Sequence, residues 1–206
     1  MSPAGNLWND RPQMLSSKET MRNMTSTYNI VVTAATALML ALVPLAAAAD
    51  RLDDLFTRLA DPDETAWETV ERDIEIQLSL SGSASADLLL RRGQAALEAG
   101  ETALAIDHLT ALTDHAPEFA EGWNTRAAAY FLAGHYGPAI HDLRHTLALE
   151  PRHWGALAGL GMILEEIGQL DAALAAFEAA SAIHPRHPDI HSALERLRLA
   201  TEGTAL

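Results

Sequence analysis

The sequence contains no cysteine. This absence excludes disulfide bonds, thiolate zinc sites, cysteine nucleophiles and lipid attachment through cysteine. Basic residues are also scarce, because 14 Lys and Arg stand against 28 Asp and Glu, for a formal net charge of −14. Nucleic-acid binding relies on positive charge that faces the phosphate backbone, so the charge balance argues against a nucleic-acid partner.

Aromatic residues and catalytic motifs are few or missing. Aromatics make up 5% of the chain and hydrophobic residues 49%, supplied mostly by alanine and leucine, which favour helices over sheets. The sequence has no Gly-rich phosphate loop, nucleophile elbow or zinc-protease motif. We therefore expect an all-α protein that is not an enzyme, with no cofactor and no small-molecule substrate.

Residues 1–49 have the pattern of a leader. An uncharged apolar stretch ends in Ala47 and Ala49, a small-x-small cleavage pattern that would leave Asp50 as the new N-terminus. A start at Met21 would give this leader the usual length of a secretory signal, and we expect translation to begin there or at Met24. Cleavage predicts a periplasmic, exported protein. The alternative is an uncleaved anchor in the inner membrane, because about 20 apolar residues can span a bilayer.

Four columns of residues recur at intervals of 34 positions, which divides the chain into repeats at 86–119, 120–153 and 154–187. A glycine in the left-handed conformation can end a helix, and a proline prevents the second helix of a repeat from continuing. Alanine allows two helices to approach closely, and a larger side chain fills the space between repeats. The columns are Gly100, Gly134 and Gly168; Pro117, Pro151 and Pro185; Ala105, Ala139 and Ala173; and Leu109, Leu143 and Phe177.

This pattern resembles the tetratricopeptide repeat, a 34-residue helix–turn–helix unit. The third repeat matches the family best, whereas the second has Arg126 and Ala127 where the family prefers Leu-Gly. The resemblance covers about half of the chain. It implies an α-solenoid of three such units, with Gly93 and Gly161 permitting close helix approach. The family shares a scaffold more than a function, so the resemblance is specific to the fold.

We expect the paired helices of the repeats near 86–99, 102–115, 120–133, 136–149, 154–167 and 170–183. Residues 50–85 predict an N-terminal helical hairpin, with helices at 50–60 and 63–78, followed at 79–85 by a short flexible link or a loose turn. Residues 188–206 predict a C-terminal capping helix, with Asp189 as its N-cap, and a tail. The hairpin either caps the array, as solenoid ends require, or its first helix is mobile or lies in the groove.

Histidines are the main candidates for metal binding. His141 and His145 are spaced i, i+4, and His184, His187 and His191 follow the third repeat. A metal site needs a closed set of ligands, and no third ligand is evident near the first pair. We therefore interpret them as surface histidines, and a metal-binding or enzymatic protein is the least favoured alternative.

In this family the first helix of each repeat lines the concave face, and some members grip a C-terminal carboxylate there with Lys, Asn and Arg. The corresponding positions here are Leu90, Gln94, Thr125, Gly155 and Gly159, so the basic clamp is absent. We therefore expect no binding of acidic chaperone tails.

The concave face instead predicts an apolar floor with acidic edges at Glu121, Glu165 and Glu166. Such a surface suits an amphipathic helix or extended peptide with apolar anchors and basic flanks. We expect Phe131 to dominate binding, although Leu97 and Phe131 are equally open to a role in the core. The candidate partner-binding residues are Leu90, Gln94, Leu97, Asn124, Ala128, Phe131, Ala158, Met162 and Glu165.

The sequence therefore predicts a non-catalytic scaffold or adaptor of the cell envelope that binds a protein or peptide in its concave groove. The alternative is a membrane-anchored or cytosolic protein of the co-chaperone kind. Contact with the membrane is expected only through an uncleaved leader.

Overall fold

The computed structural model describes residues 51–61 and 63–204, and all structural statements refer to these residues. The leader, its cleavage site and Met21 lie outside them. None of the helices in the described ranges is long and apolar enough to cross a membrane.

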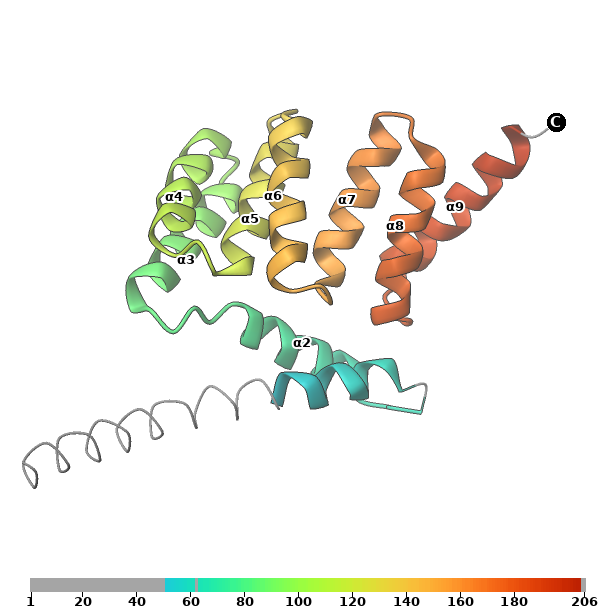
Figure 1. Cartoon of the computed structure of the whole chain (residues 1–206), viewed down its shortest axis with the longest axis horizontal. Helices are drawn as coiled ribbons and strands as arrows, with labels where there is room; N and C mark the ends of the chain where they lie inside the picture. The colour runs from blue at the N-terminus through green and yellow to red at the C-terminus, as the bar shows by residue number, and fades with distance from the viewer. Residues whose placement is uncertain (1–50, 62, 205–206) are drawn as a thin grey trace, which may run out of the picture. The chain divides into compact units, whose positions relative to one another are not determined.

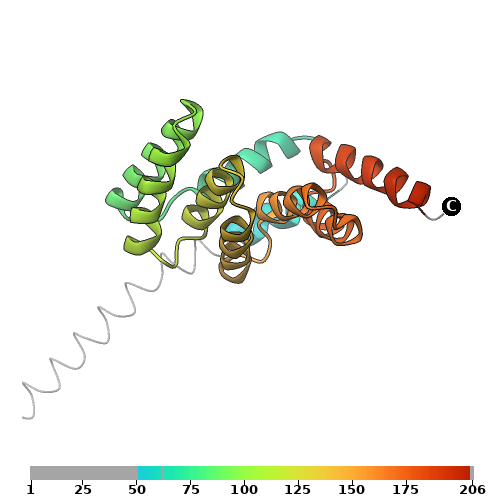
Figure 2. The same cartoon turned by 90° about the horizontal axis from the view of Figure 1, so that it is seen from above.

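The described chain is all-helical, as predicted, and its repeats form a row of antiparallel helix pairs (Figure 1). Seen from above, the row is curved (Figure 2). A helix over 51–60 precedes the labelled helices. These are α2 (Trp67–Leu78), α3 (Ala84–Glu98), α4 (Thr102–His115), α5 (Ala120–Leu132), α6 (Tyr136–Leu149), α7 (Trp154–Glu166), α8 (Leu170–Ile183) and α9 (Pro188–Thr204).

Glycine ends the first helix of every repeat, as the sequence predicts. Gly100, Gly134 and Gly168 have φ angles of 74°, 74° and 76°, a left-handed backbone conformation that residues with a side chain rarely adopt. After α3 the amide of Glu101 donates to the carbonyl of Ala96 at 2.8 Å, and the other two repeats have the equivalent bond. These bonds satisfy carbonyl groups that the end of a helix would leave unpaired.

Within the first repeat, Gly93 lets α3 lie directly against α4. A Cβ atom on Gly93 would lie 2.5 Å from Cγ of Leu109, closer than two such carbon atoms can approach. Gly161 has the same relationship to Phe177 in the third repeat. The alanine column and the Leu109, Leu143 and Phe177 column are buried throughout, which confirms the predicted register.

The N-terminal hairpin packs against the third repeat. A helical cap at the start of the array would pack against the first repeat instead. Its buried residues Leu55, Phe56 and Ile74 share one hydrophobic cluster with Trp154 of α7 and Leu197 of α9. The core of the first repeat, around Leu90 and Leu109, is a separate cluster. In Figure 1, α2 runs beneath the row of repeats.

Three local expectations need correction. The second helix begins at Trp67 and not at residue 63, because Asp61 accepts a hydrogen bond from the amide of Asp63 in the preceding turn. Asp189 is not the N-cap of α9; it lies in the first turn of that helix. Of the two readings of the segment after α2, the flexible link is wrong, since the amide of Ser81 donates to Asp87 at 3.0 Å and so anchors the turn to α3.

Candidate functional site

The first helices of the second and third repeats enclose an apolar cavity of about 390 Å³. Gly155 and Gly159 of α7 carry no side chain and so leave space opposite α5. A Cβ atom on Gly159 would meet nothing closer than Cδ2 of Leu143, at an ordinary contact distance of 3.6 Å. The residues that line this apolar cavity are Asn124, Ala127, Ala128, Phe131, Leu132, Leu143, Gly155, Gly159, Met162 and Ile163.

Four predicted partner-binding residues meet in the apolar cavity: Asn124, Ala128, Phe131 and Met162. Met162 is 48% exposed. Sequence analysis missed Leu132, which is 63% exposed at the same cavity. Its position at the last residue of α5, just before the glycine turn, was the available signal.

The other predicted residues lie elsewhere. Leu90 needs correction, because it is 2% exposed and belongs to the core of the first repeat. Leu97 is partly buried against the same cluster, and Ala158 is partly buried against the cluster of the third repeat. Gln94 lines a second cavity.

Glu165 also needs correction, because it is not a free acidic edge of the groove. Arg196 of α9 donates two hydrogen bonds of 2.8 Å to its carboxylate. These bonds hold the pKa of Glu165 below its ordinary value. This ion pair links the capping helix to the third repeat. The Glu165 carboxylate, which was expected to face a partner, is therefore paired within the chain.

The second cavity, of about 460 Å³, is more polar and lies between α2 and the first helices of the three repeats. We call it the polar cavity. It adjoins the apolar cavity, because Asn124 and Gly155 line both. Its lining residues are Arg72, Glu75, Ile76, Leu78, Ser79, Gln94, Glu121, Asn124, His153, Trp154 and Gly155.

Hydrogen bonds fix the orientation of Glu121 in the polar cavity. Nδ1 of His153 accepts the amide of Ala156 at 3.2 Å, so the ring proton lies on Nε2. That nitrogen donates to the Glu121 carboxylate at 2.9 Å, and the hydroxyl of Thr125 donates to it at 3.0 Å. The side-chain amide of Asn124 also donates to this carboxylate, at 3.3 and 3.4 Å, so three side chains orient Glu121 in the polar cavity.

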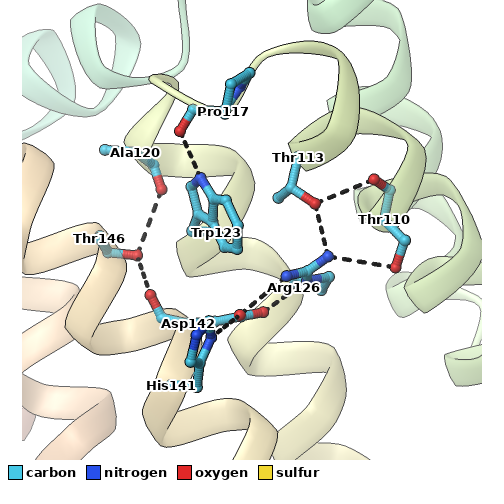
Figure 3. A network of polar contacts seen from close by, with 9 residues as sticks. All are labelled: Thr110, Thr113, Pro117, Ala120, Trp123, Arg126, His141, Asp142 and Thr146. Atoms are coloured by element: carbon cyan, nitrogen blue, oxygen red, sulfur yellow. Dashed lines mark hydrogen bonds and ion pairs between the residues drawn. The ribbon is translucent and has the colours of Figure 1, made fainter.

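A buried polar network holds α5 from the opposite side (Figure 3). Nε of Arg126 donates to Asp142 of α6 at 2.6 Å, and its Nη1 donates to Thr113 of α4 at 2.6 Å. The Arg126 guanidinium also lies 4.7 Å from the ring centroid of Trp123. The arginine that departs from the family's preferred leucine therefore links the first and second repeats, while the groove residues of α5 face the other way.

The described part of the chain holds no group of three or more His, Cys, Asp or Glu placed for a metal ion. His145 instead packs against Trp123, with ring centroids 4.0 Å apart. The expectation of surface histidines is wrong for His184, which is fully buried between the rings of Trp67 and Trp154.

The repeated helical hairpins, whose first helices line the concave face, define a helical-repeat protein. Residues 130–197 match the model of the tetratricopeptide repeat family. A TPR repeat-containing protein of Rhizobium etli is 34% identical over 158 residues, or 75% of each chain. The chain therefore belongs to the tetratricopeptide-repeat proteins.

Solved structures share the fold at lower identity. The first TPR of Spaghetti (RPAP3), bound to the HSP90 peptide SRMEEVD, has a TM-score of 0.56 and 23% identity and covers 58% of this chain and 95% of that chain. The Sgt2 TPR domain of Aspergillus fumigatus gives 0.57 and 24%, with 60% and 83% covered. The Yersinia enterocolitica chaperone SycD, in complex with a YopD peptide, gives 0.54 and 17%, with 58% and 96% covered.

Proposed function

We propose that this chain is a non-catalytic scaffold that binds a segment of a partner protein in the apolar cavity between α5 and α7. The observation that carries the proposal is the exposure of Leu132 and Met162 at a concave site of about 390 Å³. Covering these side chains would remove apolar surface from water, which favours association. The half-buried ring of Phe131 supplies a rigid anchor at the same site.

The mode of binding follows from the residues at the concave face. The Spaghetti domain and SycD were solved with bound peptides, so this fold accommodates such segments. The present chain has no basic residue at the five predicted clamp positions, and two of these, Gly155 and Gly159, line the apolar cavity. These features support apolar anchoring and disfavour the co-chaperone alternative.

We further propose that the scaffold acts in the cell envelope, with its partner on the same side of the membrane. The support is the apolar stretch that ends in Ala47 and Ala49. An inner-membrane anchor remains the alternative, and the intact mass discussed below distinguishes the two.

A displayed library of random dodecapeptides, selected on the full chain, would supply defined probes. For a selected synthetic peptide, Phe131→Ala should weaken binding about 30-fold, which corresponds to about 2 kcal/mol. Gly159→Leu should weaken it comparably, because the added side chain would enter the apolar cavity. Calorimetry would measure both affinities.

Ala179→Leu is the matched control, because it adds the same side chain to an exposed position of α8 outside the cavity. Circular dichroism would show that each variant is folded. If folded Phe131→Ala and Gly159→Leu proteins bind every selected peptide as well as the parent does, the groove is not the binding site.

A further inference from the structure

The helix α2 forms one side of the polar cavity and packs against the third repeat. Its residues Val70 and Ile74 are buried in the cluster that includes Trp154. The guanidinium of Arg186, which follows α8, donates to the carbonyl groups of Leu59 and Glu64 at 3.2 and 2.7 Å. The burial of Val70 and Ile74, together with the two hydrogen bonds to the segment that precedes α2, holds this side of the cavity against the third repeat.

The charges of the polar cavity are unequal. Glu75 of α2 and Glu121 of α5 line it together with the single guanidinium of Arg72. The Glu75 side chain makes no hydrogen bond or ion pair with any described residue, and no Lys or Arg of the described residues pairs with the Glu121 carboxylate, which contacts Asn124, Thr125 and His153. The cavity therefore carries excess negative charge from two different helices.

The electrostatics of Glu75 agree with this geometry. Although Glu75 is an exposed residue, desolvation by its surroundings, followed by the nearby carboxylates of Glu71 and Glu121, raises its pKa above the ordinary value. His187 and Arg72 act in the opposite direction but do not cancel the shift. A cation placed between Glu75 and Glu121 would relieve this repulsion.

The cavity also has features that suit a long basic side chain. Ile76, Leu78 and Trp154 provide apolar surface for its methylene groups, and the amides of Gln94 and Asn124 stand beside the carboxylates. Asn124 and Gly155 belong to the apolar cavity too, so one bound segment can reach both sites.

We propose that the polar cavity binds a lysine or arginine side chain of the partner segment, next to the apolar residue that occupies the apolar cavity. This inference rests on the proposed function of the groove and specifies its ligand. Glu75 and Glu121 would select the basic residue. Because Glu75 belongs to α2, a helix outside the repeats would contribute to the choice of partner.

The test uses the dodecapeptide library selected on the full chain. Selected sequences should be enriched in Lys or Arg at a fixed spacing from an apolar residue. Replacing the selected lysine by acetyl-lysine should weaken binding to the parent about fivefold, the effect expected of a partly exposed charge pair. In the Glu75→Gln, Glu121→Gln double variant this difference should fall below about twofold.

Two further variants sharpen the result. Arg72→Gln should increase the preference for lysine over acetyl-lysine, because it removes the competing cation from the same cavity. Asp107→Asn is the control, since it removes one negative charge from an exposed position on α4 that lines neither cavity. It should leave the preference unchanged.

The possible failures can be told apart. The cation site is overturned if no basic residue is enriched, or if the lysine preference survives in the double variant, while binding still depends on Phe131 and Gly159. If binding is also independent of Phe131 and Gly159, the groove itself is refuted and the cation site with it.

Discussion

A Cβ atom on Gly161 would lie 2.7 Å from Cδ2 of Phe177, so α7 and α8 meet without a side chain between them at this point. Phe177 is buried, and it belongs to the hydrophobic cluster that also includes residues of the N-terminal hairpin. Any side chain at Gly161 would therefore displace a ring on which several elements pack.

We expect Gly161→Leu to destabilise the fold by about 1–3 kcal/mol or more through overpacking. Gly159→Ala is the matched control two residues away, because its Cβ atom would make only an ordinary contact of 3.6 Å with Leu143. That variant should stabilise α7 by up to about 1 kcal/mol, since alanine is the better helix former. Thermal melts would measure both, and a Gly161→Leu protein with an unchanged midpoint would contradict the close approach.

The buried pair of Arg126 and Asp142 should behave as a unit. Asp142 is 1% exposed, so Arg126→Leu removes the guanidinium from a buried carboxylate that keeps only the contact with the His141 ring at 3.1 Å, and should cost about 3–5 kcal/mol. Adding Asp142→Leu should recover much of this loss, because two apolar side chains need no charge partner. Urea unfolding of the two single variants and the double variant would measure the interaction energy between Arg126 and Asp142. If the free-energy losses of the single variants simply add in the double variant, the two residues do not act as a unit.

His184 should make stability depend on pH. Burial, aided by the positive charges of His187 and Arg186, lowers the pKa of His184 from 6.5 to about 4. The unfolded chain therefore binds a proton more readily, and this group's contribution to stability is present above about pH 6.5 and declines as the pH falls toward 4. The slope from this residue is at most about 1.4 kcal/mol per pH unit.

The comparison with His184→Phe isolates this contribution. Phenylalanine can keep the ring contacts with Trp67 and Trp154, at 5.5 and 5.4 Å between centroids in the parent, and it cannot take up a proton. The free energy of unfolding of this variant should fall less steeply between pH 6.5 and 4 than that of the parent. Equal slopes in the two proteins would assign the pH dependence to other groups.

Export should remove residues through Ala49, because the apolar stretch ends in a small-x-small pattern. Intact-mass measurement of the protein from fractionated cells should then give a mature chain that begins at Asp50. A start far from Asp50, or retention of the entire apolar stretch, would contradict cleavage and favour the membrane anchor.

The amino-acid sequence by itself determined the repeat register and the ends of the repeated helices. Two requirements return every 34 positions. One is a glycine that must adopt a positive φ, such as Gly134, and the other is a small residue that must face a large one, as Gly161 faces Phe177. Three of the candidate groove residues were predictable from the helical period, which assigns Asn124, Ala128 and Phe131 to one face of α5.

Only the tertiary structure decided where the non-repeated parts pack. Arg186 meets Glu64 across 122 residues, and Glu165 meets Arg196 across 31, and no periodic pattern in the chain specifies either pair. For the same reason, the burial of His184 and the position of Glu75 beside the groove could not be derived from spacing. Local periodicity fixes which face of a helix is apolar. Which other apolar face that helix packs against depends on how well the two complete surfaces fit together.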